Sequence, residues 1–226
     1  MTRRMVKAMS DYLMTGQQLA DKVRDIATNY PTLYVMGAFG APLNDYNKNR
    51  YTGPNANEYN RRPERTAMIK AASSDTYAFD CIGMAVKAPL WGWNADKSRV
   101  YGGAVYEANG VPDKGADTVI TMCHDVSTVF NLETMRPGEY LWKSGHAGIY
   151  LGNGLAAECT PSWSNGAQIT ACNCSRTGYN TRTWTKHGKL PWVNYSGADV
   201  TVSSEQLQAL KAQAEALLNS IQALMG

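Results

Sequence analysis

The chain has 226 residues, of which 44% are hydrophobic and 18% are charged, a composition that can bury one sizeable core. No stretch approaches the roughly 18 unbroken apolar residues that a membrane-spanning helix needs, so we expect no membrane insertion. The net charge of +3 is too small to favour a nucleic-acid partner.

The first residues, MTRRMVKAMSDYLMTG, include cationic side chains but neither an apolar core region nor a small-residue cleavage site. We therefore expect no signal peptide. Residues 1–70 carry 11 basic and 6 acidic side chains, whereas residues 71–195 carry 10 of each. The basic excess is either an ordinary solvated face or a surface attracted to an anionic partner such as a cell wall.

The five cysteines are odd in number, and their spacing does not form the disulfide framework of a small secreted domain. The CNC tripeptide lacks the two-residue gap of common zinc knuckles. Reduced thiols and no bound metal fit this pattern best. The alternative is a metal site built from Cys123, His124, Cys159, Cys172 and Cys174.

The segment TGQQLADKVRDIATNY predicts a helix that ends near Pro31. Thr15 can cap it, and Gln18 stands three residues further on, which is the spacing of a capping box. The apolar residues that share one face are Leu19, Val23 and Ile26. Residues 1–30 are thus expected to be an N-terminal helical segment of the main domain.

The segment APLNDYNKNRYTGPNANEYNRRPE is rich in Asn, Tyr, Pro and Gly and has no hydrophobic periodicity. Such a composition predicts a long surface excursion that is packed by its own tyrosines. Long ordered loops of this kind are often functional.

The segment TYAFDCIGMAVKAPLWGW contains a short apolar run that can form a helix. Asp80 and Cys81 precede the run, so we expect Cys81 at or near the first turn. A thiol there meets the positive end of the helix dipole, which lowers its pKa and favours the thiolate. Cys81 is therefore a candidate nucleophile, although a cysteine at a helix start is more often a small core residue.

From Gly138 onward the pattern changes to short strands separated by Gly, Asn, Ser and Pro. The predicted strands are EYLWKS, HAGIYLG, LAAECTP, GAQITAC and KLPWVNY. Their hairpin spacing predicts an antiparallel sheet that follows a helix. The fold class is α+β.

The C-terminal segment differs in character from the rest. Residues 196–203 are predicted to be a polar linker, and residues 204–226 an amphipathic helix. Its apolar residues fall at the alternating three-four spacing of a heptad seam over about two and a half heptads. This helix either docks on the domain's own surface, mediates self-association, or forms a stalk toward a further module.

His146 begins the strand HAGIYLG, and Glu158 lies 12 residues later, beyond the GNG turn, on the next strand. When the two strands pair as a hairpin, the start of the first meets the end of the second. Glu158 can then accept the imidazole N–H and turn the other ring nitrogen toward the Cys81 thiol. These three residues together predict nucleophilic catalysis by cysteine.

Other thiols and imidazoles could compete for these roles. Cys123 and Cys159 are rival nucleophiles, but Cys159 is adjacent to Glu158 and should point to the opposite face of the strand. His124 and His187 are rival bases, but neither begins a glycine-led strand with a polar partner one hairpin away.

The segment FDCIGM resembles the Asp-Cys-Ser-Gly signature of the NlpC-like cysteine endopeptidases of peptidoglycan, and RPGEYLWKSGHAGIYLGNGLAAE resembles their His-bearing strand pair. The resemblance covers about residues 30–195. LYVMGAFG also resembles the family's Tyr-x-x-Gly-Gly segment. Ile82 stands where the family usually has serine, about 46 residues separate Tyr34 from Cys81 where the family often has far fewer, and Glu158 stands where it commonly has His, Asn or Gln.

The resemblance implies a compact papain-like fold, with a catalytic domain over residues 31–195 and the catalytic cysteine at a helix N-terminus packed on the sheet. It implies hydrolysis of an amide bond in the stem peptide or cross-bridge of bacterial peptidoglycan, typically beside D-glutamate, with no cofactor. Cys81, His146 and Glu158 would be catalytic, and Tyr34 and Asp80 would bind substrate or the oxyanion.

The expected setting is a phage lysin that is made in the host cytoplasm and acts on the cell wall after release. Two alternatives remain on the same fold. One is an N-acetylmuramoyl-L-alanine amidase that keeps the same three residues and cuts a different bond. The other is a non-catalytic module that binds the cell wall.

Overall fold

The computed structural model describes residues 12–196, and the predicted linker after its first residue and the predicted C-terminal helix lie outside them. The helical elements are α1 (Gly16–Asn29), α2 (Asp45–Thr52), α3 (Pro63–Ala71), the π-helical turn η2 (Gly83–Lys87), α4 (Ala88–Leu90), the 3₁₀ turn η3 (Ala108–Gly110) and α5 (Ala116–Met122). The strands that precede the main sheet are β1 (Met14–Thr15), β2 (Thr32–Tyr34), β3 (Phe39–Pro42) and β4 (Tyr77–Phe79). The remaining strands are β5 (His124–Ser127), β6 (Tyr140–Lys143), β7 (His146–Gly152), β8 (Leu155–Thr160), β9 (Gly166–Cys172), β10 (Thr181–Arg182), β11 (Lys186–Lys189) and β12 (Val193–Asn194).

The first helix forms as its sequence predicts. The Thr15 side chain accepts a hydrogen bond from the Gln18 backbone N–H, and the Gln18 side chain accepts one from the Thr15 N–H. This reciprocal capping box satisfies two N–H groups that have no partner inside the helix. The helix ends at Asn29, and Tyr30 is its C-cap, immediately before Pro31; the apolar face of the helix is fully buried.

The main sheet has seven strands in the order β10-β9-β8-β7-β6-β11-β5, and every neighbouring pair is antiparallel except β10 and β9. The predicted strands at HAGIYLG and GAQITAC have the observed bounds, and those at EYLWKS and LAAECTP differ by one residue at their ends. Asn153 and Gly154 both have positive φ, the conformation of a two-residue hairpin turn.

The prediction for KLPWVNY is wrong in detail. The sheet strand in this region is β11, which ends at Lys189, and only Val193 and Asn194 form a further short strand, β12, which pairs with β1. Pro191 lies between the two strands and interrupts regular pairing because proline has no backbone N–H to donate. The strands β5 and β10 were not expected from the sequence.

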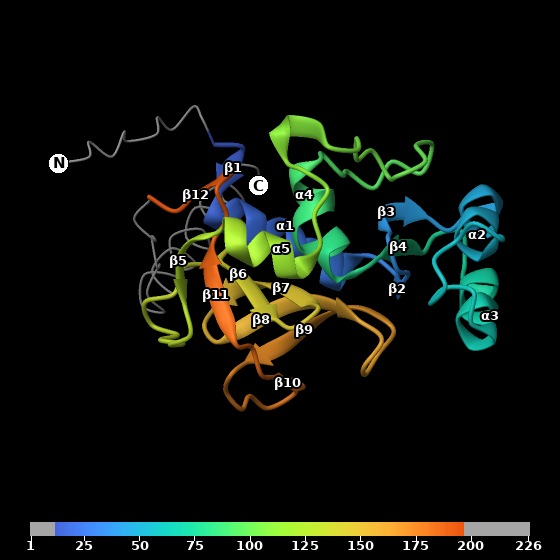
Figure 1. Cartoon of the computed structure of the whole chain (residues 1–226). Coiled ribbons are helices and arrows are strands. Elements are labelled where there is room, and N and C mark those ends of the chain that lie inside the picture. Colours follow the sequence, from blue (N-terminus) through green and yellow to red (C-terminus); the bar gives the residue numbers. More distant parts are fainter. Residues whose placement is uncertain (1–11, 197–226) are drawn as a thin grey trace, which may run out of the picture. The chain divides into compact units, whose positions relative to one another are not determined.

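Helix α1 and the helical segment that contains η2 pack against one face of the sheet (Figure 1). Alternate residues of β7 and β8, such as Ile149 and Ala157, point into this layer and are fully buried. Val23 of α1 and Met84 of η2 belong to the same core cluster. The core thus fixes the helix that follows β4 against the middle strands of the sheet.

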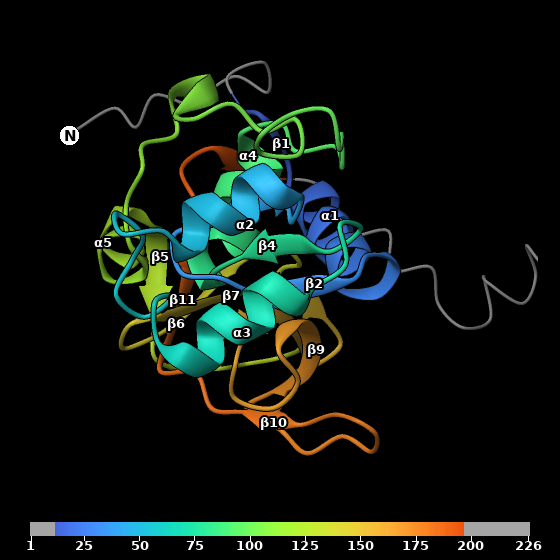
Figure 2. The ribbon, with the colours of Figure 1, turned by 90° about the vertical axis from the view of Figure 1, so that its right-hand side faces the viewer.

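The excursion after β3 is more regular than we predicted from its sequence. It contains helices α2 and α3, which lie together beside the small sheet β2-β4-β3 (Figure 2). Asn44 caps α2 by accepting from the Asn47 N–H. Tyr51 is buried in a separate core cluster with Ile69, whereas Tyr46 is exposed. The prediction of an irregular loop failed because these short helices bury very few apolar side chains.

The described residues therefore form an α+β fold built on a mostly antiparallel sheet, which confirms the predicted fold class. None of the helices in residues 12–196 has the length and the apolar character that a membrane span requires.

Candidate active site

Cys81 begins the helical segment that follows β4, and Asp80 fixes the start of that segment. The buried Asp80 carboxylate accepts hydrogen bonds from the Gly83 N–H at 2.6 Å and the Gly37 N–H at 2.8 Å. It therefore caps the first turn and also ties down the loop after β2. Burial raises the pKa of Asp80, and Lys87 together with these two N–H groups opposes that rise. Asp80 thus positions Cys81 by holding the turn in which it lies.

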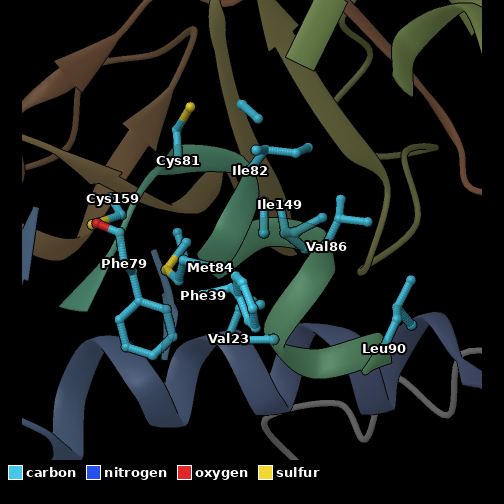
Figure 3. Close-up of a cluster of buried hydrophobic side chains, with 14 of the residues drawn as sticks. Val23, Phe39, Phe79, Cys81, Ile82, Met84, Val86, Leu90, Ile149 and Cys159 are labelled. Carbon is cyan, nitrogen blue, oxygen red and sulfur yellow. The ribbon is translucent and has the colours of Figure 1, made fainter. Parts of the chain in front are cut away.

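The Cys81 side chain points away from the labelled core residues Phe79 and Val23 (Figure 3). Its thiol lies against the backbone N–H of Ala147, the residue that follows His146 on β7. The thiol therefore lies at the His146 end of that strand. In the described structure it forms no hydrogen bond with the His146 ring.

The expectation that the helix N-terminus favours a Cys81 thiolate is wrong. Burial, and then the negative charge of Asp80, raise the pKa of the thiol to about 12. The backbone N–H groups of Ala147, Ile82 and Cys81 itself lower it, but they do not offset burial. Cys81 rests as a neutral thiol and needs a base.

His146 and Glu158 meet as the hairpin geometry predicts. In the β7–β8 pairing Glu158 lies opposite Gly148, and His146 is two residues before Gly148, so both side chains project from the same face. The Nε2 atom of His146 is 2.7 Å from Oε2 of Glu158. Because Nε2 is engaged by Glu158, Nδ1 is the ring nitrogen that would take a proton from a thiol.

Glu158 is fully buried and yet surrounded by hydrogen-bond donors. Its Oε1 accepts from the Thr170 hydroxyl at 2.9 Å, and its Oε2 lies 2.7 Å from Nη2 of Arg182. Burial raises the pKa of Glu158, but the His146 hydrogen bond and the Arg182 ion pair bring it below its ordinary value. The carboxylate is therefore ionised at neutral pH and can stabilise an imidazolium.

The His146 ring stacks on the Trp184 indole, with ring centroids 5.4 Å apart and planes inclined by 7°. The Trp184 backbone is held by Asn173, whose side chain accepts from the Trp184 N–H and donates to its carbonyl. A Cβ at Gly148 would lie 2.7 Å from the Trp184 ring. Glycine at this position is therefore what lets the indole lie over the strand beside the imidazole.

Tyr34 lies near Cys81 despite the long excursion between them. Strand β2 pairs in parallel with β4, and Tyr34 is opposite Phe79, two residues before Cys81. The buried Tyr34 ring packs edge-on against Tyr59, and its hydroxyl faces the Met36 sulfur at 3.8 Å. Burial, then the nearby Cys81, raise the pKa of the phenol.

The rival residues lie elsewhere. Cys159 is buried in the core on the other face of β8 from Glu158, and its thiol donates to the Phe79 carbonyl. Cys172 belongs to a different core cluster, and residues 12–196 contain no group of three or more His, Cys, Asp and Glu side chains that could hold a metal ion. His124 is exposed on β5.

His187 also has a carboxylate partner, which the sequence did not reveal. Its Nδ1 is 2.5 Å from Oε2 of Glu139, and its Nε2 is 3.0 Å from the Val129 carbonyl oxygen. Both ring nitrogens of His187 already have partners, so neither is free to accept a proton from a nucleophile.

Thr170, Arg182 and Trp184 were not predicted from the sequence as parts of the site. The available signal was the stretch TRTWT, in which two long side chains alternate with threonines. That alternation is typical of a strand with Arg182 and Trp184 on one face. It did not indicate that this face meets Glu158, because the register of β10 is set by tertiary contacts.

Comparisons with protein-family models and with curated proteins find no match to this chain. The geometry of Cys81, His146 and Glu158 and the motifs around them are therefore the features that indicate a function.

Proposed function

We propose that this protein is a peptidoglycan hydrolase that cleaves an amide bond in the stem peptide or cross-bridge by a Cys-His-Glu thiol mechanism. The observation that carries the proposal is the buried Glu158 carboxylate on the His146 ring, at the end of the strand where Ala147 contacts the Cys81 thiol. The motifs around Cys81 and His146, which resemble those of NlpC-like endopeptidases, supply the substrate class. The resemblance also leads us to propose a papain-like arrangement of the fold.

In the first half-reaction His146 acts as a general base through Nδ1 and takes the Cys81 proton as the sulfur attacks the carbonyl carbon. A carbon–sulfur bond forms, and the carbonyl electron pair moves onto oxygen. The imidazolium is stabilised by Glu158 and then protonates the leaving amine as the carbon–nitrogen bond breaks. This route suits a thiol that is neutral at rest, because His146 removes the proton as the sulfur attacks and not before substrate binds.

In the second half-reaction water attacks the thioester, and His146 takes a proton from it. The carbon–sulfur bond breaks, the product leaves as a carboxylic acid, and the Cys81 thiol regains its proton. No metal or organic cofactor is needed for either step. Glu158 keeps the imidazole oriented throughout.

The oxyanion is proposed to bind the Cys81 backbone N–H at the start of the helical segment. Tyr34 is next to Cys81 and is the candidate for a second contact with substrate or oxyanion, as the resemblance implies. Asp80 contributes by holding the Cys81 turn, because its carboxylate already accepts from Gly37 and Gly83.

The proposed substrate is bacterial cell wall, cut next to D-glutamate, and the proposed setting is a phage lysin that reaches the wall after release. The basic excess in residues 1–70 would assist approach to anionic wall polymers. An N-acetylmuramoyl-L-alanine amidase would use the same three residues on a different bond, so the fragments released decide between the two.

The experiment is digestion of purified Gram-positive peptidoglycan by the wild-type chain, by Cys81→Ser and by Cys123→Ser. Cys123 is a partly buried thiol outside the site and serves as the matched control. We expect peptide fragments from wild type and Cys123→Ser and none from Cys81→Ser, and mass spectrometry of the fragments identifies the bond. Sedimentation of the chain with intact wall and no hydrolysis by any variant would instead support a binding module.

A further inference from the structure

Arg182 makes a two-nitrogen contact with the carboxylate that orients His146. Its Nη2 is 2.7 Å from Oε2 of Glu158, and its Nε is 2.9 Å from Oε2 and 3.1 Å from Oε1. The exposed fraction of the side chain is 12% for Arg182 and 0% for Glu158. A charged hydrogen bond of this kind is strong because water competes little with it.

The guanidinium is held in place from its other side. Its central carbon lies 4.3 Å from the centre of the ring of Trp163, an exposed side chain. Its Nη2 also reaches the Thr160 hydroxyl at 3.5 Å. Arg182 therefore has little freedom to swing away from Glu158.

Among residues 12–196, Arg182 is the only permanently charged cation that pairs with Glu158. Glu158 lies on β8, between β7 and β9. His146 comes from β7, the Cys172 thiol from β9, the Cys159 thiol from β8 itself, and Arg182 from β10, which lies beyond β9. Burial raises the pKa of both thiols, so they stay neutral. Without Arg182 a buried carboxylate would face only an imidazole and the Thr170 hydroxyl.

We propose that Arg182 is a positioning residue of the catalytic site, which keeps Glu158 ionised and aimed at Nε2 of His146 so that the imidazole stays ready to accept the Cys81 proton. This inference rests on the proposed function. A protonated Glu158 would donate to Nε2 and leave the proton of the neutral ring on Nδ1, the nitrogen that must act as base. The charge of Arg182 opposes that state at the pH at which the enzyme works.

The test compares Arg182→Met, Arg182→Lys and the matched control Arg24→Met. Arg24 donates to the Leu151 carbonyl at the far end of β7 and does not touch Glu158. Two quantities are measured from about pH 3 to about pH 9. One is the rate of fragment release from peptidoglycan, and the other is the titration of the Glu158 carboxyl carbon by ¹³C NMR.

We expect Arg182→Met to move the acid limb of the rate profile upward by about 1–3 pH units, because a positive charge has been removed from the His146–Glu158 couple. Arg182→Lys keeps the charge and should move it less, and Arg24→Met should not move it. The Glu158 carboxyl should titrate at higher pH in Arg182→Met than in the wild type.

A rate that falls by the same factor at every pH in Arg182→Met would overturn the proposal, since a merely structural role has no reason to change the pH dependence. An unmoved Glu158 titration would overturn it as well. If Arg182→Met does not fold, Arg182→Lys replaces it in the test. The proposal then requires the acid limb of the Arg182→Lys rate profile to move upward, and an unmoved limb overturns it. If the wild type itself releases no fragments, the proposed function is overturned, and the carboxyl titration alone shows whether Arg182 holds Glu158 ionised.

Discussion

The Nε2 atom of His146 lies 2.7 Å from Oε2 of Glu158, although 12 residues separate the two in the chain. The tight turn at Asn153 and Gly154 folds β7 back on β8 and brings the ends of the hairpin together. Glu158 is fully buried, so the contact is made where water does not weaken it. The hairpin therefore holds two of the proposed site residues, His146 and Glu158, in a fixed arrangement on adjacent strands.

Replacing Glu158 with Gln tests whether this pair acts in catalysis. Gln keeps the shape but removes the charge that stabilises an imidazolium, so we expect hydrolysis to fall by about 10²–10⁴-fold. Initial rates of amine release from peptidoglycan give the comparison. Glu133→Gln, at an exposed position, is the control and should keep the wild-type rate. A Glu158→Gln rate within a few-fold of wild type would remove Glu158 from the mechanism.

The resting state of Cys81 can be measured without a substrate. With its pKa raised to about 12 by burial and Asp80, the thiol should be alkylated by iodoacetamide at a rate that keeps rising above pH 9.0, its ordinary value. Peptide mass spectrometry follows Cys81 separately from the other thiols, and N-acetylcysteine in the same tube provides the reference. An alkylation rate that reaches a plateau below neutral pH would mean that Cys81 and His146 form a thiolate–imidazolium pair at rest. The proposed first step, in which His146 deprotonates a neutral thiol, would then be wrong.

Gly148→Ala tests the stacking of Trp184 on His146. The added methyl carbon would lie 2.7 Å from the indole, so the ring must move away from its present place. We expect a loss of stability of about 1–3 kcal/mol from overpacking. We also expect hydrolysis to fall by about 10²-fold because the imidazole loses its support.

Urea unfolding and initial rates measure the two effects of Gly148→Ala. Gly115→Ala is the matched control, since its Cβ would meet nothing within 4 Å. Full activity in Gly148→Ala would show that the stacking does not matter for the reaction.

The second histidine–carboxylate pair predicts a pH dependence of stability. Glu139 raises the pKa of His187 above 6.5, so the folded state binds a proton more tightly than the unfolded chain. The stabilisation is fully present below pH 6.5 and is lost as the pH rises through the folded-state pKa. Urea midpoints from about pH 5 to about pH 9 measure it.

In His187→Gln the urea midpoint should fall less as the pH rises, because Gln does not titrate. His124→Gln, on the exposed strand β5, should leave the fall unchanged. A wild-type midpoint that rises across this range would contradict the assigned direction.

Local patterns predicted much of this fold. The capping box at Thr15 and Gln18, the Asn153-Gly154 turn and the period-two strands around them depend on neighbouring residues, and the structure contains them all. The hairpin pairing of His146 with Glu158 could be predicted for the same reason, since strand register follows from turn length.

Features that depend on tertiary contacts could not be predicted. Helix α2 is stabilised by the Asn44 cap and by burial of Tyr51 rather than by a hydrophobic stripe. Arg182 meets Glu158 only because β10 pairs with β9 in parallel after an irregular connection. The thiolate prediction for Cys81 failed because burial and the charge of Asp80 outweigh the N-terminus of a short helical segment.

The central claim is that Cys81 is the nucleophile of an amide hydrolase, and the most direct measurement is amine release from purified peptidoglycan by wild type and by Cys81→Ser at equal concentration. We predict new amino groups from the wild type and none above background from Cys81→Ser, with both proteins showing the same folded spectrum by circular dichroism. Equal release by the two proteins would contradict the account, because Cys81 would then be a structural residue.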